Sequence, residues 1–309
     1  MHWWTVRCFD VSIEERPEDI MRIVTLTPGA TDIVIALGLE SSLVGVAEQC
    51  LLPARLSDLT RFTFPAPMLS DATQRLTAEI RALKPDVVVS DDCGQGERVD
   101  LALPNVRTIH LVTVTLDDLF ENISRVGQAL GATSAAELAL RGLRYRRNRI
   151  AERASRIRDE QKPRVLFLEQ LKPPLSASRW TPQLISLAGG RSLMGMARDN
   201  SGSSDWDRIS VLDPDVIFVA SDPTGRSTSV DQLAMLASRR EWRKMRAVEH
   251  HRVYLTNEKA IFDAAGPALI DALEVLAHTL HPSLHEPPLI QDVVHKPQMQ
   301  TQRQHAGDA

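Results

Sequence analysis

A short phrase that joins a helix end, a Pro-Asp turn and the start of a strand occurs once in each half of this 309-residue chain. Residues 83–87 read LKPDV, and residues 212–216 read LDPDV. Each copy runs into a fully apolar segment, which is typical of a parallel strand that is buried on both faces of its sheet. The repeat therefore predicts two similar α/β lobes, with ligands bound near the carboxyl ends of their strands.

The order of strand and helix patterns supports this division. Residues 116–161 show helical periodicity without strand signals, and Gly131 interrupts it. Thr31 or Asp32 is expected to cap the first helix. Strands are predicted at residues 22–26, 43–47, 87–89, 106–111, 164–168, 216–219 and 253–255.

We therefore predict an α/β fold with two Rossmann-like lobes, whose parallel sheets are joined by one long backbone helix. The predicted parts are an N-terminal extension (1–21), an N-terminal lobe (22–116), a linking helical segment (117–162), a C-terminal lobe (163–282) and a disordered tail (283–309).

Charge and motifs narrow the classes of function. The net charge of −4 argues against a nucleic-acid-binding protein, which usually carries a basic excess. The arginine-rich residues 141–158 are interrupted by Glu152, so we interpret them as a solvated helix face that bridges the two lobes. The sequence has no phosphate-binding loop, dinucleotide fingerprint or nucleophile elbow. These observations predict a protein that is not an enzyme.

The first residues predict the location of the protein. Residues 1–20 contain acidic side chains and no apolar segment of signal-peptide length, and no run of 18 apolar residues occurs in the chain. We therefore expect a cytoplasmic protein without stable membrane insertion, and a periplasmic protein only if the true start differs from Met1, with Met21 as one alternative start.

At this point the sequence resembles a known family, the solute-binding proteins of ABC transporters for cobalamin and iron chelates, and most of all their cobalamin-binding branch. The resemblance spans residues 22–282. Its motifs are RIVTLTPGATDIVIALGLE (22–40), LVGVAEQCLLP (43–53), LKPDVVVSDDCG (83–94), LEQLKPPL (168–175), WTP (180–182), LAGG (187–190), WDRISVLDPDVI (206–217), RVY (252–254), GP (266–267) and LHP (280–282).

The resemblance implies a fold of the class III periplasmic-binding-protein type and a binder with no chemical step. Its ligand would be a corrinoid or a metal chelate, held between the lobes as cargo, so we expect no cofactor. The chain would serve an ABC transporter or be a cytoplasmic relative of such a protein. Candidate ligand-binding residues are Thr27, Pro28, Gln49, Cys50, Asp91, Asp92, Cys93, Gln170, Trp180, Trp206, Asp222 and Phe262.

Two alternatives concern these residues. Cys50 and Cys93, with Asp91, Asp92 or Glu48, have the ligand chemistry of a metal site, which would suit a metal-dependent enzyme or a metal-binding protein. The other interpretation is two unpaired thiols near a pocket, and we favour it because the sequence has no CxxC pair. Trp180 and Trp206 are either ligand contacts or packing residues.

The resemblance also implies a permease partner. Transport members of the family present an acidic residue on each lobe to basic residues of the permease. The matching positions are Glu79, or the neighbouring Ala78, in the first lobe and Asp207 in the second.

Overall fold

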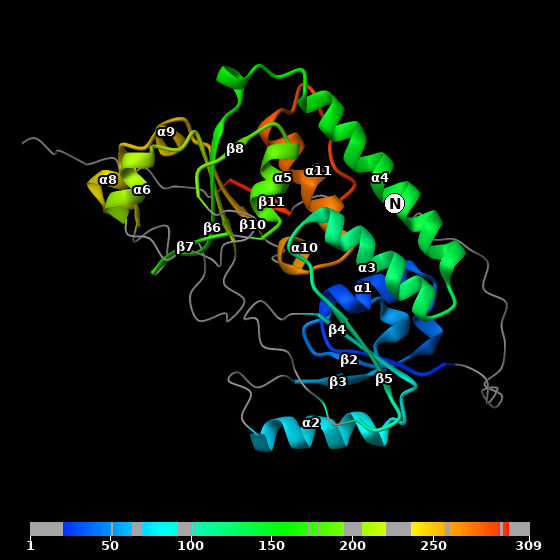
Figure 1. Ribbon diagram of the computed structural model, residues 1–309. Helices are drawn as coiled ribbons and strands as arrows, with labels where there is room; N and C mark the ends of the chain where they lie inside the picture. The colour runs from blue at the N-terminus through cyan, green and yellow to red at the C-terminus, as the bar shows by residue number, and fades with distance from the viewer. Residues whose placement is uncertain are drawn as a thin grey trace, which may run out of the picture.

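Two sheets, one built from each half of the chain, form the framework of the protein (Figure 1). The computed structural model describes residues 21–50, 52–63, 70–91, 101, 103–171, 173–177, 179–194, 206–220, 236–256, 260–290 and 293–296. None of the helices in these ranges is long and apolar enough to cross a membrane.

Among the described residues, the first sheet contains five strands, and these strands pair in parallel. Helices α1 (Pro28–Ala36) and α3 (Leu116–Ala129) cover one face, and α2 (Ser70–Ala82) covers the other. In spatial order the strands are β3 (Thr60–Phe62), β2 (Leu43–Ala47), β1 (Ile23–Thr25), β4 (Val87–Asp91) and β5 (Arg107–Leu111).

The second sheet contains six strands, in the order β11-β10-β9-β6-β7 with β8 beside β6. Only β7 and β11 of these run antiparallel to their neighbours. The strands are β6 (Arg164–Leu171), β7 (Pro174–Ser176), β8 (Arg191–Ser192), β9 (Val216–Ala220), β10 (Val253–Thr256) and β11 (Val294–His295).

Helices cover both faces of the second sheet as well. Phe167 and Phe218 pack on the side of α5 (Thr181–Leu187) and α11 (Ala268–Leu280), whereas Leu166 and Ile217 face the opposite side. This alternation follows from the two-residue period of a strand. The helices on the opposite side are α6 (Trp206–Leu212), α8 (Arg240–Arg243) and α9 (Arg246–Glu249).

A pair of helices connects the two sheets. α3 begins with a capping box, in which Thr115 and Asp118 satisfy each other's backbone N–H groups, and it ends just before Gly131, whose φ of 70° is left-handed. α4 (Thr133–Ala154) then runs for 22 residues, or about 33 Å, alongside both lobes (Figure 1). The predicted helical connection and its break at Gly131 are confirmed.

The repeated phrase makes the same contact in both lobes. Asp86 Oδ2 accepts a hydrogen bond of 2.7 Å from the backbone N–H of Arg22, just before β1. Asp215 Oδ2 accepts one of 2.8 Å from the backbone N–H of Arg164, at the start of β6. In each lobe the aspartate of the repeat thus ties the turn before one central strand to the start of the neighbouring strand.

The structure corrects two predictions about helices and the tail. Thr27 caps α1, because its Oγ1 accepts a hydrogen bond from Ala30 N; Thr31 and Asp32 lie inside the helix instead. The tail from residue 283 was predicted to be disordered, which is wrong for residues 283–290 and 293–296. His285 and Val293 are buried there, and β11 pairs with β10.

The repeated contact leads to a stability prediction. We expect Asp215→Ala to lower the free energy of unfolding by about 2 kcal/mol and Asp86→Ala by about 1 kcal/mol. The order follows because the bond of Asp215 is partly buried and this carboxylate also pairs with Arg246, whereas the bond of Asp86 is exposed to water. Urea unfolding measures both losses. Asp86→Asn, which keeps a side-chain oxygen that can accept from Arg22 N, is the control. Equal losses of unfolding free energy for Asp86→Ala and Asp215→Ala would contradict the expected order.

Candidate ligand-binding site

The two lobes touch at the segments that follow strands β1 and β10. After β1, Thr27 and Pro28 open helix α1, so both predicted site residues lie at this junction. The next residue, Gly29, lies against the backbone of Ala265, which follows the short helix α10 (Ala260–Asp263) beyond β10. A Cβ atom on Gly29 would lie 2.7 Å from the carbonyl carbon of Ala265, so only glycine permits this approach.

One apolar core continues through the junction. It joins Ile23 and Val89 of the first sheet to Val165 and Phe218 of the second. α1, α3, α4, α5 and α11 all contribute buried side chains to it. Because a close-packed core resists deformation, the two lobes are held at a defined angle.

Polar contacts support this junction from the side of α4. Arg146 Nε and Nη2 donate to the two carboxylate oxygens of Glu274 at 2.9 and 2.7 Å, and Nη2 also donates to Asp271. Gln183 Oε1 accepts a hydrogen bond of 2.8 Å from Leu116 N. The interpretation of the arginine-rich segment as a bridging helix face is thus confirmed, with Arg146 as the residue that joins α4 to α11.

Asp32 is a residue at this junction that the sequence analysis did not recognise as part of the site. The nearest atoms to a Cβ built on Gly266 are Cβ and Oδ2 of Asp32, at 3.0 and 3.1 Å, so the aspartate rests on the loop before α11. Burial, with a smaller contribution from the Asp271 carboxylate, raises the pKa of Asp32 to about 7. A half-buried carboxyl group that titrates near neutrality therefore lies between the lobes.

Cys50 lies in a chain of buried polar groups behind the end of β2. Its Sγ is 3.1 Å from Thr31 Oγ1, which in turn is 2.6 Å from Thr25 Oγ1. Burial raises the pKa of the Cys50 thiol, against the hydrogen bond with Thr31, which lowers it. Within the described ranges no group of three His, Cys, Asp or Glu residues has the arrangement of a metal site.

Three predicted site residues lie at or just beyond the carboxyl ends of strands, where the sequence analysis expected ligands to bind. Gln49 is exposed after β2, Asp91 is the half-buried last residue of β4, and Gln170 is exposed near the end of β6. Their contact with a ligand stays a prediction. Asp92, Cys93 and Asp222 lie outside the described residues.

Trp180 and Phe262 lie together on the core side of the second sheet. The indole Nε1 of Trp180 donates a hydrogen bond of 2.7 Å to the backbone oxygen of Phe262, and both side chains are buried. The Phe262 ring also lies 5.1 Å from that of Phe167 on β6. This pair fixes α10, and hence the loop that reaches Gly29.

Trp206 is separated from Trp180 by the second sheet. It packs against the cluster on the α6 side, where its ring meets Trp242 edge to face at 5.7 Å. The structure therefore brings Trp180 and Phe262 together and leaves Trp206 on the other face. The sequence left open whether Trp206 is a ligand contact or a packing residue; in the structure it packs against Trp242.

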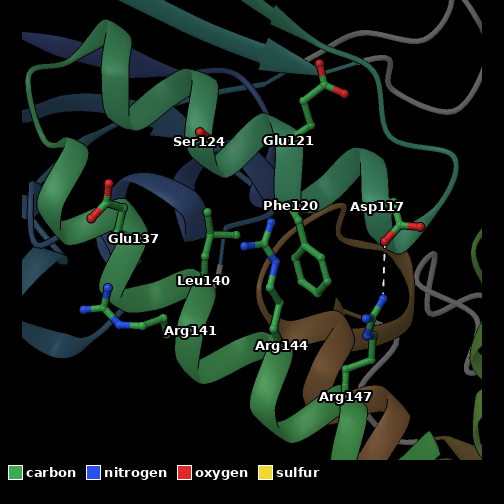
Figure 2. Close-up of a pocket in the computed structure, with 9 residues that line it drawn as sticks. All are labelled: Asp117, Phe120, Glu121, Ser124, Glu137, Leu140, Arg141, Arg144 and Arg147. Atoms are coloured by element: carbon green, nitrogen blue, oxygen red, sulfur yellow. Dashed lines mark hydrogen bonds and ion pairs between the residues drawn. The ribbon is translucent and has the colours of Figure 1, made fainter.

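A cavity of about 600 Å³ lies away from the junction, between α3 and α4 (Figure 2). The guanidinium groups of Arg144 and Arg147 lie 5.5 and 5.6 Å from the centre of the Phe120 ring, and Arg147 pairs with Asp117 at 3.3 Å. Its lining contains three arginines and three carboxylates, so the charges balance and no ligand class is selected. The junction remains the better candidate site.

Comparison with known proteins agrees with this geometry. A sequence profile of the family described as "Periplasmic binding protein" matches residues 23–260. Among curated relatives, an uncharacterized ABC transporter substrate-binding lipoprotein of Bacillus subtilis is 24% identical over 280 residues, which cover 88% of this chain and 83% of the relative. A vitamin B12-binding protein of Vibrio cholerae is 26% identical over 273 residues, covering 85% and 90%.

Solved structures show the same fold. A periplasmic heme-binding protein from Pseudomonas aeruginosa superposes with a TM-score of 0.72 at 23% identity, covering 91% of this chain and 99% of that chain. The periplasmic vitamin B12-binding protein of Vibrio cholerae gives a TM-score of 0.66 at 22% identity, covering 84% and 96%. The resemblance inferred from sequence and the predicted fold class are both confirmed.

The predicted cytoplasmic location is wrong. The matching family is described as periplasmic, and the Bacillus subtilis relative is a lipoprotein of an ABC transporter. These relatives point to a location outside the cytoplasm. The prediction relied on the absence of a leader-like segment at the start of the sequence, and such an absence carries less weight than the location of the relatives.

The raised pKa of Asp32 makes stability depend on pH. The group binds its proton more tightly in the folded chain (pKa about 7) than in the unfolded chain (3.8), so its contribution is complete below pH 3.8 and is lost as the pH rises to 7. We expect Asp32→Asn to be more stable than the parent by about 2–4 kcal/mol at pH 8 and nearly equal at pH 4.

Urea unfolding at both pH values tests this expectation. Glu137→Gln removes an exposed carboxylate from α4 and is the matched control, with an expected effect under about 0.5 kcal/mol. A gain for Asp32→Asn that is the same at pH 4 and pH 8 would rule out titration of Asp32 as its cause.

Proposed function

Because the chain belongs to the periplasmic binding protein family, we propose that it is the substrate-binding component of an ABC importer and that its ligand is a cobalamin-like corrinoid. The observation that carries the proposal is the junction at Gly29 and Ala265, where the segments that follow β1 and β10 meet over one shared core. Ligands of open parallel sheets bind beyond such ends.

The ligand class is supported by the relatives and by the chemistry of the junction. Vitamin B12-binding proteins recur among the relatives, and heme-binding proteins recur among the similar structures. Both ligands are large macrocycles that carry a metal; the heme ring is largely apolar, and the corrin ring of cobalamin also carries polar amide side chains. Apolar walls with a few polar groups suit such a ligand. Polar groups at the strand ends include Gln49, Asp91 and Gln170.

The protein acts by binding and release, with no chemical step. In this proposal the corrinoid is cargo, and no separate cofactor takes part. The alternative of a metal-dependent enzyme or metal-binding protein relied on Cys50, Asp91, Asp92 and Cys93. Of these, the Cys50 thiol is buried and engaged by Thr31, and Asp92 and Cys93 lie outside the described residues. Within the described ranges, no group of three His, Cys, Asp or Glu residues includes Cys50 in the arrangement of a metal site.

Binding of a corrinoid is the direct test. We expect cyanocobalamin to bind in calorimetry and to quench tryptophan fluorescence. Gln49→Trp and Gln170→Trp place a bulky group at exposed strand-end positions, so we expect each to weaken binding at least about tenfold by obstruction. Gln128→Trp, at an exposed position of α3, is the matched control with unchanged affinity. Binding of hemin but not of cyanocobalamin would reassign the ligand to heme. Binding of neither compound would contradict the proposal.

A permease partner extends the proposal. Glu79 is exposed on α2 of the first lobe, and Asp207 is exposed on α6 of the second. Each lobe thus presents a carboxylate on the surface of a helix. Two carboxylates on separate lobes would contact basic residues of a permease at two points. Such contacts mainly set the rate and orientation of docking.

Charge reversal tests this partner. We expect Glu79→Lys combined with Asp207→Lys to reduce uptake through the cognate permease at least about tenfold, because two attractive contacts become repulsive, while ligand affinity stays unchanged. Glu137→Lys on α4 is the control with the same change of charge per site. Full uptake by the double variant would remove these residues from the docking surface.

A further inference from the structure

β5 is an edge strand of the first sheet, because it pairs only with β4 among the described strands. The N–H of Arg107 donates to Asp86 O of the β4 side at 3.1 Å. Backbone groups alternate in direction along a strand, so the N–H and C=O of Thr108 face away from β4. Among the described residues none forms a hydrogen bond with Thr108, whose side chain is exposed.

A groove of about 490 Å³ runs along this edge, between β5 and α3. Two arginines line it, one from each element. Arg107 Nη1 donates to Ala129 O at 2.8 Å, and Arg125 donates to Asn122 Oδ1 at 3.1 Å and to His110 O at 3.4 Å. These hydrogen bonds fix the positions of both guanidinium groups while using neutral acceptors only.

The positive charges of Arg107 and Arg125 have no negative partner among the described residues. In the part of the chain that the structure describes, neither Arg107 nor Arg125 forms an ion pair, and no carboxylate lines the groove. The α3–α4 cavity differs, since its three arginines face three carboxylates. Fixed guanidinium groups without a counter-charge are strong, directional ligands for carboxylates.

We propose that the edge of β5 is a docking site for an extended, acidic segment of a partner protein, which adds as a strand beside β5 and pairs its carboxylates with Arg107 and Arg125. Main-chain hydrogen bonds to Thr108 would supply affinity, as in other strand-addition complexes. Val112, which is 49% exposed just beyond β5, offers an apolar contact to the same segment.

A second copy of this chain is a poorer occupant. Pairing β5 with β5 would bring two sets of arginines to one interface, and like charges placed opposite each other are destabilising. Charged side chains on edge strands commonly prevent self-association. Here the same two charges that oppose a second copy select an acidic partner.

The test uses the full chain and a hexapeptide that alternates threonine and glutamate. At low salt we expect binding in calorimetry, with slowed hydrogen exchange at the Thr108 amide. The double variant Arg107→Gln, Arg125→Gln should weaken binding at least about tenfold. Arg141→Gln with Arg144→Gln removes the same charge from exposed positions of α4 and should leave the affinity unchanged.

Two further peptides separate strand addition from general charge attraction. A peptide with glutamine in place of glutamate should bind at least about tenfold more weakly, because the carboxylates are gone. A peptide with proline in place of threonine keeps the charge, but its fixed φ and missing N–H groups disfavour a paired strand, so it should protect the Thr108 amide less than the threonine peptide does. Equal binding of the proline peptide, or equal losses in both arginine pairs, would overturn the proposal. None of these outcomes depends on corrinoid binding.

Discussion

The junction at Gly29 is the constraint on which the arrangement of the lobes depends. A helix N-terminus from one lobe meets the backbone of Ala265 from the other with no room for a Cβ atom, and one apolar core continues on both sides of this contact. Arg146 then joins α4 to the carboxylates of α11. Close packing and a shared ion-pair network make large rotations of one lobe against the other costly.

Asp32 introduces an opposing electrostatic cost at the same junction. Arg146 pairs with Asp271 and Glu274, but no described residue pairs with Asp32. Burial, with a smaller contribution from Asp271, raises the pKa of Asp32 to about 7, so it keeps its proton up to about neutral pH. Ionisation would place a further negative charge beside Asp271. A protein exposed to varying pH outside the cytoplasm would thus have a junction that is tighter in acid than in alkali.

The sequence predicted most strands and helices well, because each of them depends on a short pattern of neighbouring residues. Apolar runs and the repeated Pro-Asp turn located most strands, and the two copies proved equivalent in detail: Lys84 and Asp213, at matching positions of the repeat, have left-handed φ values of 46° and 43°. Short strands such as β3 and β11 were missed, because two or three residues give no period. The sequence placed Thr27 and Pro28 in the site, but it missed the contact of Gly29 with Ala265 and the burial of Asp32, because these depend on residues that are far apart in sequence.

The arginines of the chain show why residue type alone does not define a site. Arg146 joins α4 to α11, whereas Arg144 and Arg147 rest on the Phe120 ring. All three come from the same arginine-rich segment, residues 141–158. Arg107 and Arg125 lie outside that segment and belong to no motif. Only the fold brings them to one groove beside an edge strand, held by neutral acceptors. What distinguishes a binding arginine from a structural one is therefore whether the surrounding residues already supply its counter-charge.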